Sequence, residues 1–245
     1  MSTHRYALAA SFITLALLAT VNNLARSETV VIPSNRDNTL FQDPSGALSS
    51  GAGPSIFAGN NSTGNIRRAL VYFDVAGAVP AGAAIDSVEL HLYVSSAPND
   101  VPQMFTIHHV LISWGEGTSV SVGGSGAPAT LNDATWLHRF YPATLWANAG
   151  GDFDPIVLAS ANVGGVGEWV WTGDPLTSDV RAWYDSPANN LGWLVAGDES
   201  AASTVRRFES RETANPDQRP RLIVHYSLTV PVLPTSWGRI KHLYR

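Results

Sequence analysis

The stretch RRALVYFDVAGAVPAGAAIDSVELHLYVS, residues 67–95, decides the fold class of this chain. Its second half alternates between apolar and other residues from Val88 to Val94. That period of two is typical of a strand with one face in a core and the other toward solvent. Residues 69–73 are apolar on both faces, which favours a strand buried between layers. The connection at 76–84 is rich in turn formers and favours an arch rather than a helix.

Short β-rich runs recur along the rest of the chain. The sequence therefore predicts an all-β, jelly-roll-like antiparallel β-sandwich with long loops and one short helix. The other predicted strands are residues 29–33, 39–42, 55–58, 105–114, 156–160, 168–172, 191–196, 204–210 and 221–227. Residues 176–184 have the helical spacing, and we expect one or two turns there. A glycine- and serine-rich loop, 115–129, is expected to be flexible, and the aromatic-rich segment 130–155 to be ordered.

The two ends of the chain differ from the middle. An apolar run at 6–21 follows His4 and Arg5 and precedes small residues around Ser27, the order of a secretory signal peptide. The run is shorter than the roughly 20 residues of a membrane span, so we expect cleavage and no transmembrane segment in the mature chain. The expected organisation is a signal peptide (1–27), one β-sandwich domain (28–228) and a C-terminal tail (229–245). The protein would be secreted or held at the cell surface.

The tail combines basic and apolar residues after Pro231 and Pro234. Prolines favour an extended linker outside any strand, so the domain is expected to close near Tyr226. The tail is then either a sorting or docking segment or a frayed terminus without a role.

Charge and composition exclude some functions. The formal net charge is -5, and the first 27 residues carry two arginines and no acid, so their removal would leave -7. Such a chain lacks the basic face that nucleic acid requires. There is no cysteine, so an exported domain of this kind depends on its core. Lys241 is the only lysine, and arginine has the planar fork that fits carboxylates.

No catalytic motif stands out. HExxH, GxSxG and phosphate-loop patterns are all missing from the sequence, so we expect no enzymatic activity. A polysaccharide-degrading enzyme is the least favoured alternative; turnover that disappears on replacing Asp152 or Asp154 would support it. Asp37, Asn38 and Asp43 gather oxygen ligands near the start of the domain. These oxygens would suit calcium, but capping of turns by Asp and Asn is the favoured interpretation, and no other cofactor is expected.

Aromatic residues in the segment 130–155 are candidate ligand contacts. Trp136, Tyr141 and Trp146 fall where no regular strand obliges them to be core. Flat rings pack against the apolar faces of pyranose sugars, so these three could bind carbohydrate. The alternative is that the tryptophans plug an edge of the sandwich.

Arginines near the C-terminal strands are the second group of candidates. Arg206 and Arg207 fall on one predicted strand, and Arg221 begins the next. If these strands form a hairpin, Arg207 and Arg221 share a neighbourhood and could hold uronate carboxylates through paired hydrogen bonds. The alternative is a set of surface ion pairs with Glu209, Glu212 and Asp217, which contribute little energy.

Four tracts together resemble the DNRLRE domain, a secreted bacterial module that overlaps the alginate-binding carbohydrate-binding modules. They are RALVYFDV with PAGAAIDSVELHLYV (68–94), DATWLHRFYPATLWANAGGDFD (133–154), VRAWYDSPANNLGWLV (180–195) and FESRETANPDQRPRLIVHY (208–226). The resemblance implies a jelly-roll sandwich and a role on polysaccharide-related surface proteins, and supplies no catalytic residues.

The expected function is therefore an exported, non-catalytic carbohydrate-binding or cell-surface module. Acidic, uronate-containing polysaccharide is the first candidate ligand. The alternative is a structural subunit of the cell surface or extracellular matrix that associates with copies of itself.

Overall fold

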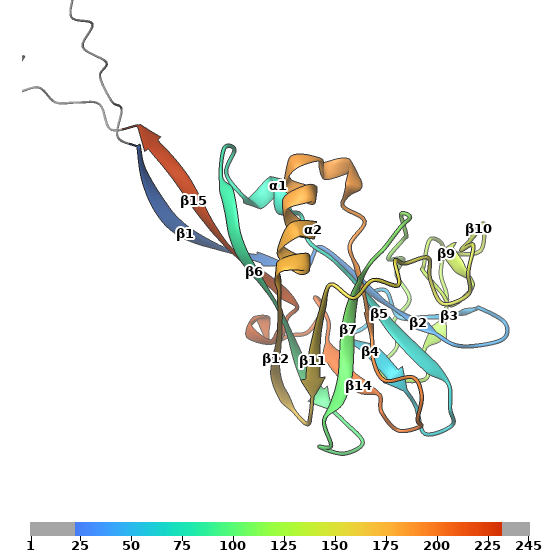
Figure 1. Cartoon of the computed structure of the whole chain (residues 1–245). Coiled ribbons are helices and arrows are strands. Elements are labelled where there is room, and N and C mark those ends of the chain that lie inside the picture. Colours follow the sequence, from blue (N-terminus) through green and yellow to red (C-terminus); the bar gives the residue numbers. More distant parts are fainter. Residues whose placement is uncertain (1–22, 232–245) are drawn as a thin grey trace, which may run out of the picture. The chain divides into compact units, whose positions relative to one another are not determined.

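The computed structural model describes residues 23–231, with side chains from 26 to 228 (Figure 1). Ser27–Leu228 forms one compact unit. The expected signal peptide and C-terminal tail fall mainly on residues 1–22 and 232–245, outside the described part of the chain. Between residues 23 and 231, no helix has the length and apolar character needed to cross a membrane.

Antiparallel strands dominate the described chain, which confirms the predicted all-β class. The strands are β1 (Asn23–Pro33), β2 (Arg36–Phe41), β3 (Leu48–Ser49), β4 (Ser55–Asn60), β5 (Ile66–Tyr72), β6 (Ala84–Ser96), β7 (Gln103–His109), β8 (Ala127–Pro128), β9 (His138–Phe140), β10 (Thr144–Leu145), β11 (Ala159–Val163), β12 (Gly167–Thr172), β13 (Trp193–Ala196), β14 (Arg206–Glu209) and β15 (Arg221–Pro231). The helices are α1 (Val75–Ala78) and α2 (Asp174–Asp185), with short 3₁₀ turns at Pro187–Asn189 and Pro216–Gln218.

One large sheet curls on itself to make the sandwich. Its order is β1-β15-β6-β14-β4-β5-β13-β7-β11, with β12 beside β6 and β2 beside β5. Strand β4 pairs with β14 over its first four residues and with β5 over its last two, so it passes from one layer to the other. We call the part containing β6, β12, β14 and β15 layer A, and the part containing β2, β5, β13, β7 and β11 layer B.

The stretch that decides the fold supplies one strand to each layer. Strand β6 belongs to layer A, and its alternating residues from Val88 to Val94 are buried, as the period predicts. Strand β5 lies inside layer B, with β2 on one side and β13 on the other. The arch between them differs from the expectation, because Val75–Ala78 forms one helical turn. The side chain of Asp74 caps this turn by accepting a hydrogen bond from the backbone of Gly77.

Layer B is covered on both faces. Ala69 and Val71 of β5 face the sandwich core, whereas Leu70 between them joins a second apolar cluster on the outer face. Leu194 of β13 belongs to that second cluster, together with tryptophans from the segment after β7. Burial on both faces explains why residues 69–73 are apolar without alternation.

Helix α2 is longer than the one or two turns expected. It covers twelve residues and buries Val180 and Trp183 in the main core. The guanidinium of Arg181 donates to the carbonyl oxygens of Ile85 and Asp86, which fixes the helix against the start of β6.

Several predicted boundaries are wrong. Strand β11 begins at Ala159 rather than at residue 156, β7 ends at His109, and β15 continues through Pro231. The loop 115–129 is packed rather than loose: β8 pairs with β3, and Ser119 is buried.

Candidate functional site

The predicted hairpin between β14 and β15 does not form. Both strands pair antiparallel with β6, β14 near its end and β15 along its first half. Arg207 lies opposite Ser96 and Arg221 opposite His91, so the two arginines are five residues apart along β6. The sequence could not show that β6 lies between β14 and β15, because both strands pair with a segment that is distant in the chain.

Arg206 is a structural residue. Its side chain is fully buried, and its guanidinium donates to the carbonyl oxygens of Val101, Val163, Gly164, Thr204 and Val205. These bonds hold the loops before β7 and after β11 against the start of β14. Because its side chain is fully buried, Arg206 cannot contact a ligand at the surface as predicted.

Arg221 is occupied by its own neighbours. Its guanidinium donates to the carbonyl oxygen of Asp217 at 2.8 Å and forms an ion pair with Glu168 of β12. Arg221 therefore forms a surface ion pair, but with Glu168 and not with the acids named as the alternative, since Asp217 contributes only its backbone carbonyl.

The two tryptophans among the candidate aromatics belong to the core. Trp136 and Trp146 are 8% and 6% exposed and lie in the cluster on the outer face of layer B. The indole nitrogen of Trp146 donates to the carbonyl oxygen of Thr135 at 2.9 Å. Tyr141 is half-buried, with its ring edge-on to His138. The two tryptophans thus pack against the outer face of layer B and do not form an exposed surface for sugar binding.

The structure does not bring the three predicted calcium ligands together. The side-chain oxygen of Asn38 already accepts hydrogen bonds from Thr39, Ser49 and Ser50. Asp43 lies past the end of β2, where its carboxylate accepts from Ser45. Asp37 is fully buried on β2, several strand residues away from Asp43.

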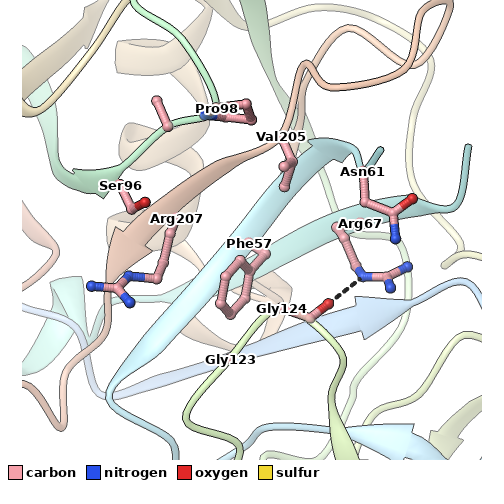
Figure 2. A pocket seen from close by; sticks show the side chains of 10 residues that line it. Phe57, Asn61, Arg67, Ser96, Pro98, Gly123, Gly124, Val205 and Arg207 are labelled. Carbon is pink, nitrogen blue, oxygen red and sulfur yellow. Dashed lines mark hydrogen bonds between the residues drawn. The ribbon is translucent and has the colours of Figure 1, made fainter. Parts of the chain in front are cut away.

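A surface pocket of about 320 Å³ lies where β4, β5, β14 and the end of β6 meet. Phe57 forms its floor, Arg67 and Arg207 stand on opposite sides, and the backbone of Gly124 closes one wall (Figure 2). We call it the arginine pocket. The register explains its assembly, because Arg207 lies between Phe57 of β4 and Ser96 of β6 on three adjacent strands.

Arg207 keeps most of its hydrogen-bonding capacity. Its Nε donates to the hydroxyl of Ser95 at 2.9 Å. Neither terminal nitrogen bonds to any side chain or carbonyl between residues 26 and 228. A guanidinium has five N–H donors, so an incoming anion could still take a paired contact from this side chain.

Arg67 is held more firmly. Its Nε donates to the carbonyl oxygen of Gly124 at 3.1 Å, and a terminal nitrogen donates to Ile66 at 2.9 Å. The guanidinium carbon also lies 5.0 Å from the ring centre of Phe41, a cation–π distance. Burial lowers the pKa of Arg67, and the nearby charge of Asp43 opposes that shift. Arginine keeps its positive charge in proteins at neutral pH, so Arg67 remains a cation in the pocket.

The lining of the arginine pocket carries positive charge only. It contains two arginines and no aspartate or glutamate, on a chain whose formal net charge is negative. An anion entering it meets two cations and an aromatic floor. Arg67 is a site residue that the sequence did not predict. The available signal is that Arg67 and Arg68 are adjacent at the start of an otherwise apolar strand.

A second depression, of about 380 Å³, brings together two residues predicted for different roles. Its lining includes Trp136 and Asp43, with Gln42 and Asn65. The ring of Trp136 is covered by the guanidinium of Arg68 at 5.1 Å. This depression has no basic residue in its lining, so it does not suit an acidic ligand.

Within residues 26–228, no three histidine, aspartate or glutamate side chains converge as a ready-made metal site. No protein-family model matches this chain, and no curated protein matches its sequence.

Proposed function

We propose that this protein is a non-catalytic carbohydrate-binding module whose arginine pocket holds a carboxylate of an acidic polysaccharide. The observation that carries the proposal is Arg207, which lines a pocket with a second arginine and no acid and whose terminal nitrogens bond to no described residue. The resemblance to DNRLRE domains points to the same ligand class, but the proposal does not depend on it. Export to the cell surface, where such polysaccharides occur, is part of the same proposal.

The chemistry of the pocket suits a uronate better than a neutral sugar. A guanidinium and a carboxylate form two parallel hydrogen bonds, which fix the orientation of the sugar ring. Phe57 is 4% exposed, so the ring contributes an apolar floor and not a stacking platform. Binding energy would then come mainly from the charged contacts, and affinity would fall with added salt.

The test is retention of the full chain on gels containing alginate, pectin or a neutral glucan. We expect retention on the acidic gels only. Arg207→Ala should weaken binding about tenfold or more, because a charge-assisted paired contact is lost. Arg207→Lys should be intermediate, since it keeps the charge without the planar fork.

Arg221→Ala is the matched control. Arg221 is also partly exposed on layer A, but it lies outside the arginine pocket. If this variant loses as much retention as Arg207→Ala, binding depends on general charge and the assigned pocket is wrong. If the unaltered protein is not retained on any acidic gel, the proposed ligand class is wrong.

A further inference from the structure

A five-residue turn between β4 and β5 contributes to both the arginine pocket and the second depression. The turn, residues 61–65, is closed by a hydrogen bond from the backbone N–H of Asn61 to the carbonyl oxygen of Asn65 at 3.1 Å. Asn61 lines the arginine pocket, where Figure 2 shows it beside Arg67. Asn65 lines the second depression. The pocket and the depression are therefore neighbours on the surface.

A charge in the second depression acts on a residue of the arginine pocket. Asp43 belongs to the lining of the depression, and its charge opposes the lowering of the pKa of Arg67. Phe41, two residues before Asp43, lies opposite Arg67 in the pairing of β2 with β5. The ring of Phe41 also packs against Phe57, with 6.0 Å between the ring centres. The floor of the pocket and one wall of the depression thus belong to one connected part of the structure.

The pocket and the depression differ in the charge that they favour. The arginine pocket is lined by two arginines and no acid, whereas the second depression is lined by Asp43 and no base. Arg68 lies over the ring of Trp136, but its guanidinium forms two hydrogen bonds of 2.8 Å with the carboxylate of Glu199. Its charge is therefore already compensated. A carboxylate is attracted into the arginine pocket and repelled from the depression.

The second depression offers the groups that suit hydroxyls. The carboxylate of Asp43 accepts from the backbone of Ser45 at 3.1 Å and keeps further lone pairs for other donors. The side-chain oxygen of Gln42 accepts from a backbone N–H at 2.8 Å, and its nitrogen donates to no residue between 26 and 228. Trp136 and Leu137 supply an apolar wall. A few polar groups on an apolar wall match a neutral sugar, whose hydroxyls both donate and accept.

We propose that the arginine pocket and the second depression bind neighbouring sugar residues of one polysaccharide, a uronate in the pocket and a neutral sugar in the depression. This inference rests on the proposed function, and it narrows the ligand class to polysaccharides in which uronate and neutral residues alternate. Asp43 selects the neutral neighbour, because a second carboxylate at this place is repelled. A polymer with uronate at every position still binds through the arginine pocket, but more weakly.

The experiment compares retention of the full chain in three affinity gels at low salt. Polygalacturonate carries a uronate at every position, hyaluronan alternates uronate with a neutral N-acetylated sugar, and a neutral glucan carries no charge. We expect the strongest retention with hyaluronan, about fivefold weaker binding to polygalacturonate, and none to the glucan. The difference reflects hydrogen bonds gained with the neutral sugar and repulsion avoided at Asp43.

Asp43→Asn is the decisive variant, because it should improve binding to one polymer. We expect binding to polygalacturonate to strengthen about threefold and binding to hyaluronan to change little. Asparagine also caps turns, so the contact with the Ser45 backbone is kept. Asp86→Asn is the matched control: it removes the same charge from an exposed position on β6, ten residues before Ser96 and thus roughly 30 Å along the strand. It should leave the ratio between the two polymers unchanged.

Asn65→Leu tests the depression from its other side. It replaces the amide with an apolar side chain that fills part of the depression, whereas the backbone bond to Asn61 remains. Binding to hyaluronan should then fall to the level of polygalacturonate, and binding to polygalacturonate should stay as in the parent.

The outcomes separate this inference from the function on which it rests. A preference for hyaluronan that Asp43→Asn narrows and Asp86→Asn does not supports the inference. Equal retention by the two acidic polymers, both dependent on Arg207, overturns the inference and leaves the proposed function in place. An equal effect of Asp43→Asn and Asp86→Asn also overturns it, because total charge would then explain the result. No retention by either acidic polymer overturns the proposed function and the inference together.

Discussion

Arg206 and Arg207 are adjacent on β14 and have opposite roles because their side chains leave opposite faces of the strand. The guanidinium of Arg206 is fully buried and donates only to main-chain carbonyl oxygens. That of Arg207 lies at the arginine pocket with one bond, to Ser95. The period of two along a strand separates a structural arginine from a candidate binding arginine in neighbouring positions.

Arg206→Met should destabilise the domain strongly. It removes the donor for five carbonyl oxygens, including Val101 and Gly164, several of which are buried and would stay unpaired. We expect a loss of about 3 to 5 kcal/mol in the free energy of unfolding, measured with urea. Arg207→Ala is the internal control and should change stability by about 0.5 kcal/mol or less. Equal losses in the two variants would contradict the division of roles.

Trp146→Ala should behave as a core substitution. The side chain is 6% exposed and lies against layer B, and its indole nitrogen bonds to Thr135. Truncating a buried tryptophan costs about 3 to 5 kcal/mol. Tyr141→Ala, from the same segment but half-buried, should cost much less. If Trp146→Ala instead keeps the free energy of unfolding of the parent but loses retention on the glycan gel, the indole contacts ligand and our assignment to the core is wrong.

Two patterns in the sequence bear on the position of these tryptophans. Residues 69–73 were predicted to be buried on both faces, and this is correct for β5. A strand buried on both faces requires a second covering layer. Trp136 and Trp146 are part of that layer, against Leu70. A strand with two apolar faces and an aromatic-rich segment together favour a core position for these tryptophans.

The arginine pocket could not be predicted in the same way. Arg207 is distant in the chain from Phe57 and Arg67, and it meets them because β4 pairs with β14 at one end and with β5 at the other. Local periodicity predicts which face a side chain takes but not which strands become neighbours. The same limit produced the wrong hairpin between β14 and β15.

Glu89 should contribute stability that is lost in acid. Hydrogen bonds from His91 and His225 lower its pKa below the ordinary value of 4.5. An acid whose pKa is lowered on folding stabilises the protein above its unfolded pKa, and this contribution disappears as pH falls through the folded pKa. We therefore expect Glu89→Gln to flatten the stability profile below about pH 4.5.

Urea unfolding at a series of acid pH values tests this. Asp86→Asn, an exposed acid on the same strand, is the control and should keep the profile of the parent. A profile unchanged in Glu89→Gln would mean that the two histidines do not stabilise the charged form of Glu89.

His109 should have the opposite pH dependence. It is half-buried at the end of β7, and its Nδ1 lies 3.1 Å from the carboxylate of Asp179 on α2. The same carboxylate accepts from the indole nitrogen of Trp193 at 2.7 Å, so it ties the helix to two strands of layer B. The hydrogen bond to Asp179 is the main cause of a raised His109 pKa, with smaller support from the charge of Asp154. Protonated His109 is therefore favoured by folding.

A histidine whose pKa is raised on folding contributes stability that is complete below its unfolded pKa of 6.5 and is lost as pH rises through the folded pKa. We expect the free energy of unfolding to fall as pH rises from about 6 to 8, with a slope that Asp179→Asn removes. Asp185→Asn, an exposed acid at the end of the same helix, should keep the slope. Nuclear magnetic resonance titration of the His109 ring gives the folded pKa directly. A value at or below that of an unfolded peptide would show that Asp179 does not hold the imidazolium, and that the Asp179 carboxylate joins α2 to layer B through Trp193 alone.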